Sequence, residues 1–376
     1  MSPTKKALVL SGGGGRGAYH IGVIEELVRR NWIADGQGPD IIAGTSIGAI
    51  NAAALASGLT VAELRDHWLA MHTEEVHRLS NDLPVAARPL LNFILRSVLT
   101  SDAHGGARAV LPEEERGLTA EGLFRRLTKL FHASPFRSLL DTSPWRQTLS
   151  SWMNFERINS PHAPALLLAA TELQSGALRI FCNRSLNGNP PDEIILDHLM
   201  ASSSIPIVYP WTEIGDAKYW DGAVLANTPL EPVIDLAGDE DVDIVVVMMT
   251  PWNATEDEMR SQTRQMPKDL VQALSLTLDW TLLASYRVAF EMLEHRNQLA
   301  DAAEKLERAA RHMGDASMRM AGPSFRRITP PTVIAPQELM PLDWIIDYED
   351  ANHMALFERG RADAARAMEQ REEAHL

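Results

Sequence analysis

Residues 40–53 constrain the fold of this chain more than any other stretch of its sequence. The β-branched pair Ile41-Ile42 leads into Gly44-Thr45-Ser46-Ile47-Gly48, and an alanine-rich pattern of helical character follows. This order predicts a strand, a sharp turn and a helix with a serine at the turn, an arrangement known as a nucleophile elbow. So tight a turn requires residues without a Cβ on both sides of the serine, because the backbone returns close to itself.

Ser46 is therefore the candidate nucleophile. The amide groups and the dipole of the following helix would stabilise negative charge that develops beside it. The same five residues also fit a turn whose serine only caps the helix. The motifs elsewhere in the chain decide between these two interpretations.

The composition is that of an ordinary globular protein with an acidic surface. Of the 376 residues, 45% are hydrophobic, which is enough to bury a large core. The formal net charge of −15 argues against nucleic acid as a partner, because a phosphate backbone would be repelled. Cys182 is the single cysteine, which excludes an intrachain disulfide and a cysteine-based zinc cluster.

The chain shows neither a signal peptide nor a membrane-spanning segment. Ala7–Leu10 is too short for the apolar region of a signal peptide, and no run approaches the ~20 apolar residues of a membrane-spanning helix. We therefore expect a soluble, cytoplasmic protein.

A glycine-rich loop follows the first predicted strand, Ala7–Leu10, and precedes a helix predicted from Ala18 to Arg30. Its successive glycines can turn their N–H groups into a nest for an anion. Gly12-x-Gly14-x-x-Gly17 also satisfies the dinucleotide fingerprint. A dinucleotide-binding fold, however, needs an acidic residue at the end of the next strand. Here Asp40 precedes that strand. We therefore favour an oxyanion hole, formed by the amides of Gly13, Gly14, Gly15 and Ile47.

Three linked motifs resemble those of the patatin-like phospholipase family. They are Gly12-Gly13-Gly14-Gly15-Arg16-Gly17, Gly44-Thr45-Ser46-Ile47-Gly48 and Asp221-Gly222-Ala223, in that order. The run Ala201-Ser202-Ser203-Ser204-Ile205-Pro206 is also similar to the family's approach to its catalytic aspartate. The resemblance covers residues 6–58 and about 164–250. It implies a three-layer α/β/α fold with a mainly parallel central sheet, a Ser46–Asp221 dyad without histidine, and lipid acyl hydrolase activity.

Asp221 ends the strand predicted at Lys218–Trp220. An aspartate before a glycine commonly only forms a turn. Its apolar neighbours, Tyr219 and Trp220 among them, instead predict that burial raises its pKa and makes it a better base. We expect Asp221 to take the Ser46 proton as the hydroxyl attacks an ester carbonyl, and later to activate the water that hydrolyses the acyl-enzyme.

Three histidines follow Asp221, in the order of an α/β-hydrolase triad: His295, His312 and His353. The first two fall in charged helical stretches, which favours solvated helix positions. His353 begins the last predicted helix and is harder to dismiss. No metal-binding loop or cofactor motif is visible, so we predict calcium-independent activity.

The sequence divides into a catalytic core at 1–250, with a helical insertion at about 72–150, and a mainly helical extension at 251–376 packed on the core. Leu90–Leu99, in the insertion, fits a lid or a lipid-contacting helix, or else a helix that packs on the core.

Val242–Met249 is predicted as the final buried strand, and an irregular, proline-rich connection precedes the last helix. Near the end of the long helical pattern, apolar residues form one stripe: Leu299, Ala303, Leu306, Ala310 and Met313. This stripe is typical of a homodimer seam or of a helix that folds back on its own domain.

Two other functions remain open. An acyltransferase or thioesterase would use the same nucleophile with another acyl acceptor, although such transacylases pair their serine with a histidine. A nucleotide- or lipid-binding module would bind without turnover.

Overall fold

The computed structural model describes residues 4–81, 137–252, 266, 270–313, 327–341 and 343–374. One predicted feature lies outside these residues, namely the Leu90–Leu99 helix. None of the described helices is long and apolar enough to cross a membrane.

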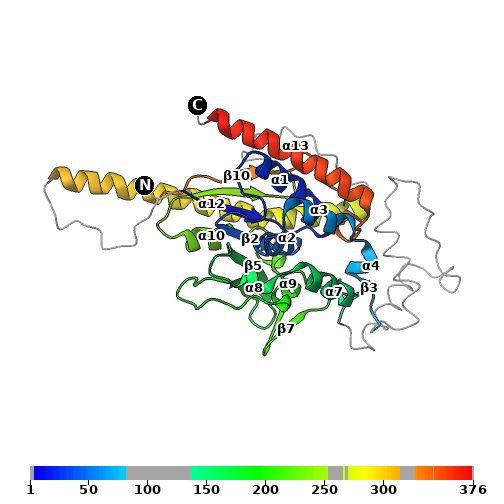
Figure 1. Cartoon of the computed structure of the whole chain (residues 1–376). Coiled ribbons are helices and arrows are strands. Elements are labelled where there is room, and N and C mark those ends of the chain that lie inside the picture. Colours follow the sequence, from blue (N-terminus) through cyan, green and yellow to red (C-terminus); the bar gives the residue numbers. More distant parts are fainter. Residues whose placement is uncertain are drawn as a thin grey trace.

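Parallel strands form the centre of the molecule (Figure 1). β1 (Lys5–Leu10) lies between β2 (Ile41–Thr45) and β9 (Val242–Val247). β2 pairs in turn with β5 (Ala165–Glu172), and β10 (Thr332–Ile334) lies beyond β9. All these pairs are parallel, and the strands are continuous apolar runs because both faces of the sheet are covered. The mainly parallel sheet predicted from the sequence is confirmed.

The other strands of the sheet are antiparallel. β6 (Leu178–Cys182) pairs with residues 167–171 of β5 after a turn in which Gly176 has a φ of 65°. β8 (Ala217–Asp221) pairs with residues 170–172 of β5 and with β7 (Thr212–Ile214). Since β6 occupies one edge of β5, β2 and β8 share the other edge. They run toward each other, and their carboxyl ends meet.

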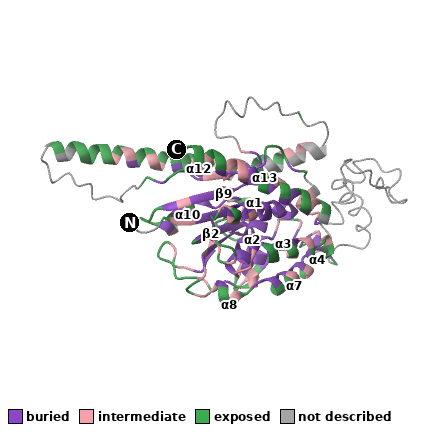
Figure 2. Ribbon diagram, turned by 45° about the horizontal axis from the view of Figure 1, so that its top comes forward, coloured by how far each residue is buried: buried purple, intermediate pink, exposed green. Residues whose placement is uncertain are grey.

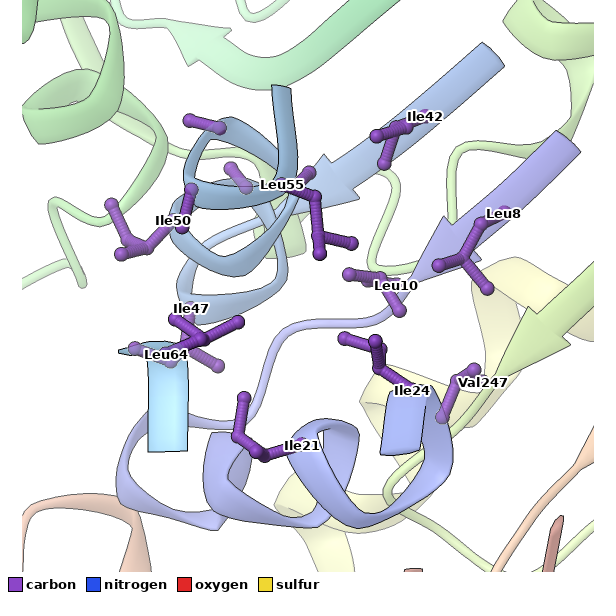
Figure 3. Packing of buried hydrophobic residues seen from close by; sticks show 14 of the residues in the cluster. Leu8, Leu10, Ile21, Ile24, Ile42, Ile47, Ile50, Leu55, Leu64 and Val247 are labelled. Carbon is purple, nitrogen blue, oxygen red and sulfur yellow. The ribbon is translucent and has the colours of Figure 1, made fainter. Parts of the chain in front are cut away.

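Helices cover both faces of the sheet, which gives the expected three layers (Figures 1 and 2). Alternate residues of β1 face opposite ways: Leu8 and Leu10 join one core, and Ala7 and Val9 join the other. The first core packs against α1 (Ala18–Arg29), α2 (Ile47–Ala56), α3 (Val61–Leu69) and α13 (Asp350–Ala374), and Figure 3 shows its centre. The second packs against α10 (Leu230–Ala237) and α12 (Leu270–Met313).

Shorter elements surround the sheet. They are the 3-10 turns η1 (Gly14–Gly17), η5 (Gly222–Val224) and η7 (Asp343–Ile345), the helices α4 (Thr73–Val76), α7 (Ser143–Trp152), α8 (Phe155–Ile158) and α9 (Leu196–Ser202), and the strands β3 (Arg78–Leu79) and β4 (Leu140–Asp141).

The C-terminal helix packs closely on the first helix of the chain, as Figure 1 shows for α13 and α1. A Cβ at Gly22 would lie 1.9 Å from the carbonyl oxygen of Phe357, and one at Gly360 would lie 2.1 Å from that of Tyr19. The Tyr19 hydroxyl also donates to Asp363 across this contact, at 2.9 Å. Glycine on each helix therefore lets the two backbones touch.

The extension after residue 250 is not only helical. β10 joins the sheet next to β9, so Val242–Met249 is not the final strand, and the prediction of an irregular connection is wrong at this point. The four residues between Pro331 and Pro336 are too few to show a strand period, and the pairing depends on β9, which lies far away in the sequence.

The helix α12 has two unlike faces. Leu293 and Ala300 are buried, whereas Leu299 is 54% and Leu306 60% exposed, and Figure 2 shows the outer turns as largely exposed. Ala303 is half-buried, and the side chains of Ala310 and Met313 lie outside the described residues. The homodimer seam stays a prediction.

Candidate active site

The turn that carries Ser46 is as tight as its sequence indicates. Ser46 has a φ of 57° and a ψ of −128°, a strained conformation for a residue other than glycine, and it precedes α2 directly. A Cβ at Gly44 would lie 2.4 Å from the carbonyl of Gly48, and one at Gly48 would lie 2.2 Å from the carbonyl oxygen of Leu10. Both glycines are required because the backbone comes this close.

Asp221 is fixed at the end of β8 by backbone contacts on both sides. Its N–H donates to the carbonyl of Ser204 at 2.8 Å, and its own carbonyl accepts from the Thr171 hydroxyl at 3.0 Å. The Ala223 N–H donates to the Asp221 carboxylate at 2.8 Å. Next to it, a Cβ at Gly222 would lie 2.5 Å from the carbonyl oxygen of Ala169. The carboxylate therefore has a defined direction.

The sheet brings Ser46 and Asp221 together. Thr45, directly before Ser46, pairs with Ala169 of β5, and Asp221 pairs with the next residue, Ala170. Because β2 and β8 end against each other along this edge, the Ser46 side chain lies beside the Asp221 carboxyl, close enough to affect its pKa. The two residues are 175 positions apart in the sequence.

Burial makes Asp221 an unusually strong base for a carboxylate. Asp221 is 2% exposed and Ser46 is 4% exposed. Desolvation raises the pKa of Asp221 to about 7, against the opposing effect of hydrogen bonds from the Ala223 N–H and the Ser46 hydroxyl. A base with a pKa near 7 is suited to proton transfer at neutral pH.

The first glycine of the glycine-rich loop lies beside Ser46. A Cβ at Gly12 would lie 3.0 Å from the Cβ of Ser46 and 2.6 Å from Oδ1 of Asn227. The Gly12 N–H donates to that Oδ1 at 3.0 Å. Asn227 therefore holds the loop against the candidate nucleophile.

The remaining residues of the loop lie against the C-terminal part of the chain. A Cβ at Gly13 would lie 2.4 Å from the sulfur of Met249. At Gly14, whose φ is 60°, it would lie 1.9 Å from the carbonyl oxygen of Ile345, and at Gly15 it would lie 2.4 Å from that of Asp347. Gly17 is equally confined, by Ile47 and Trp68. No sequence pattern predicts that residues 344–347 pack on this loop.

Arg16 is fully buried and binds backbone carbonyls. Its guanidinium donates to the carbonyl of Met340 at 2.9 Å and to that of Pro341 at 3.2 Å. These contacts favour a role for Arg16 in holding the structure together over one in binding a lipid phosphate.

Two tyrosines near Asp221 have no signal in the sequence. Tyr209 and Tyr348 lie close enough to affect each other's pKa, and the Tyr209 hydroxyl contacts Nδ1 of His77 at 2.9 Å. Burial raises the pKa of both tyrosines, and the negative charge of Asp221 raises each further. Tyr348 comes from the segment that packs on the glycine-rich loop, so only the folded chain brings it here.

The three later histidines are placed as follows. His295 and His312 are exposed on α12, and the His312 ring contacts the carbonyl of Arg308 at 2.9 Å. His353 is buried in α13, with its ring 5.2 Å from that of Trp68. Among the described residues, no group of three or more His, Cys, Asp or Glu side chains is arranged to hold a metal ion.

Together these groups offer a hydroxyl, a buried base and a glycine-rich backbone, the parts that acyl transfer through a serine ester requires. A family model described as Patatin-like phospholipase matches residues 8–234. The chain therefore belongs to the patatin-like phospholipase family, which is a family of lipid hydrolases.

Solved structures similar to this chain include two bacterial proteins. VipD from Legionella pneumophila has 15% identity and a TM-score of 0.37, with 95% of this chain and 67% of VipD covered. ExoU of Pseudomonas aeruginosa, in its complex with SpcU from the type III secretion system, has 23% identity and a TM-score of 0.31. There, 79% of this chain and 52% of that chain are covered, so this chain spans about half of its length. A search of curated proteins finds no match.

Proposed function

We propose that this chain hydrolyses carboxylic esters of lipids, with Ser46 as nucleophile and Asp221 as general base. The observation that carries the proposal is the position of the Ser46 side chain beside a buried carboxyl whose pKa is raised to about 7. Membership of the family supports the lipid as the substrate class.

In the first half of the proposed reaction, Asp221 takes the hydroxyl proton while the Ser46 Oγ attacks the ester carbonyl. The negative charge moves to the carbonyl oxygen, where amides of Gly13, Gly14, Gly15 and Ile47 would bind it. One well-placed donor of this kind contributes ~10²–10³ in rate. The intermediate then collapses, the alcohol leaves with the proton from Asp221, and an acyl-enzyme remains.

In the second half, Asp221 takes a proton from water, and the resulting hydroxide attacks the acyl-enzyme. The acid leaves, and the Ser46 Oγ regains its proton from Asp221. Each group returns to its first state, and no step changes an oxidation state. An acyltransferase differs in this half alone, because an alcohol or a thiol replaces the water.

Labelling with a fluorophosphonate tests the nucleophile directly, because the probe forms a bond to an activated serine. We expect the parent protein to be labelled and both Ser46→Ala and Asp221→Asn to resist. Ser57→Ala is the matched control: Ser57 lies at the other end of α2, is buried, and donates to Ala53 within its own helix at 2.9 Å. Equal labelling of the parent and Ser46→Ala would refute the assignment.

The substrate is best identified with a mixed lipid extract. We expect free acids and lysolipids in the mass spectrum, in equal amounts with and without a chelator of calcium. Added alcohol or thiol acceptors separate the two enzymatic alternatives, since a transferase releases little free acid and forms a new ester or thioester. A protein that binds lipid without product formation would support the binding module instead.

A further inference from the structure

Ser202, the last residue of α9, is fully buried and uses its single hydroxyl twice. Its Oγ accepts a hydrogen bond from the Ser46 N–H at 3.0 Å and donates to the carbonyl of Ala169 at 2.6 Å. Ala169 is the β5 residue that pairs with Thr45, directly before Ser46. The hydroxyl therefore ties the turn that carries Ser46 to the strand beside it.

This bond acts where the backbone is most strained. A residue other than glycine at a φ of 57° stays there only while its surroundings hold it. The Ser46 N–H also stands at the start of α2, where backbone donors have no partner within the helix. Ser202 supplies that partner in a place closed to water.

The same short segment also holds Asp221. Two residues after Ser202, the carbonyl of Ser204 accepts the Asp221 N–H at 2.8 Å. The hydroxyl of Ser203, between them, instead donates to the carbonyl of Leu199 at 3.0 Å, inside its own helix. The three consecutive serines 202–204 thus have different roles, and only the Ser202 hydroxyl hydrogen-bonds to the backbone of the candidate nucleophile.

We infer that Ser202 is a positioning residue, whose hydroxyl fixes the Ser46 backbone so that the Ser46 side chain stays directed at Asp221. The inference rests on the proposed function, because Ser202 acts on the reaction through Ser46. It neither touches the substrate nor takes a proton. Without its hydroxyl the Ser46 turn relaxes, and a displacement of about 1 Å in a reacting group can cost roughly 100-fold in rate.

The test compares Ser202→Ala with Ser203→Ala. For Ser202→Ala we expect kcat to fall about 10- to 100-fold with KM nearly unchanged, and the rate of fluorophosphonate labelling to fall in parallel. Ser203→Ala removes a hydroxyl from the adjacent position, and we expect it to keep the activity of the parent. Ser202→Thr keeps a hydroxyl and should restore most of the lost rate.

The pH profile separates positioning from a general loosening of the fold. If Ser202 only supports the fold, Ser202→Ala lets water reach Asp221, and the midpoint of the kcat/KM profile moves to lower pH. If Ser202 positions Ser46, the plateau falls and the midpoint stays. Should Ser202→Ala be insoluble, Ser202→Cys keeps the side-chain volume but is a weak hydrogen-bond partner, and the same comparison applies.

Equal kcat values for Ser202→Ala and Ser203→Ala, or a shifted midpoint, would overturn the inference. The proposed function fails in a different way, through unchanged labelling or turnover in Ser46→Ala. The two failures are therefore distinguishable in a single set of variants.

Discussion

The Asp221 carboxyl lies beside the Ser46 side chain in a site where neither residue is more than 4% exposed. Burial keeps the pKa of this carboxyl at about 7, so its protonation changes within the range of ordinary assays. A general base must be ionised to take a proton, which sets the sign of the pH dependence.

We predict that kcat/KM falls as the pH drops through about 7 and reaches a plateau above about 8. One unit below the pKa, roughly a tenth of the base is ionised, so the rate there should be about a tenth of the plateau. The profile is measured with a soluble ester, with circular dichroism at each pH to show that the fold is intact. A flat profile through pH 7 with a fall near pH 4 would contradict an unusually basic Asp221.

The same shift predicts that Asp221→Asn abolishes activity yet stabilises the protein. Because the folded state raises the pKa of Asp221 from 3.8 to about 7, the folded protein binds more protons than the unfolded chain between these values. Stability from this group is full below pH 4 and is lost as the pH rises to 7. At pH 8 the amide should raise the free energy of unfolding by at most about 4 kcal/mol.

Urea unfolding of both proteins at pH 8 and pH 5 measures this effect. The advantage of Asp221→Asn should shrink at pH 5, where the parent carboxyl is mostly protonated in the folded state. A variant that is less stable than the parent at pH 8 would show that the charge of Asp221 is not the source of strain.

The sequence predicts the elements that carry the site because each has a local cause. Gly44 and Gly48 flank Ser46 where the backbone comes into contact with itself, and the apolar neighbours of Asp221 predict that it is buried. The strand, turn and helix around Ser46 follow from these residues alone.

What the sequence does not predict depends on contacts between distant segments. Thr332–Ile334 becomes a strand because β9 offers an open edge, and Tyr348 reaches the site because residues 344–347 pack on Gly14 and Gly15. Ser202 and Ser203 are the same type of residue, and only the contacts of their hydroxyls in the folded chain distinguish their roles. Such partners are tens to hundreds of positions apart, beyond the reach of any local pattern.

Gly44→Ala should destabilise the protein strongly. Its Cβ would lie 2.4–2.5 Å from backbone atoms of Gly48 and Ala49, which cannot move without deforming the Ser46 turn. We expect a loss of about 3 kcal/mol or more in the free energy of unfolding. The matched control is Gly176→Ala, in an open hairpin turn with no atom within 4 Å, where the positive φ costs about 1 kcal/mol. Equal losses in urea unfolding would contradict the close contact.

Arg16→Met tests whether the buried guanidinium serves the fold or the substrate. Methionine fills similar space but leaves the carbonyls of Met340 and Pro341 without these donors, so we expect a loss of at least about 2 kcal/mol in stability. Proteolysis near residues 340–349 should also become faster. A variant with unchanged stability but a raised KM for phospholipids relative to neutral esters would show that Arg16 meets a lipid phosphate.

The exposed face of α12 predicts a homodimer. Met292, Leu299 and Leu306 repeat every seven residues, as in a helix that pairs with another, and they are 54–60% exposed on a face turned roughly 100–140° away from the buried Leu293. Glu291 and Lys305 lie on one side of this stripe, two heptads apart. If a second copy packed antiparallel, Glu291 of each copy would face Lys305 of the other, which gives two pairs of opposite charge. An exposed apolar surface of this kind is typical of a site that binds another protein.

Analytical ultracentrifugation of the whole protein tests this prediction. We expect a dimer for the parent and a monomer for the double variant Leu299→Glu, Leu306→Glu, with hydrolytic activity retained because α12 contributes no proposed catalytic group. Ile207→Glu is the control, since Ile207 is 62% exposed and lies away from α12 in the sequence. A monomeric parent, or a double variant that is still a dimer, would mean that the stripe is not the seam, and that the apolar face is covered by other parts of the same chain or by a different molecule.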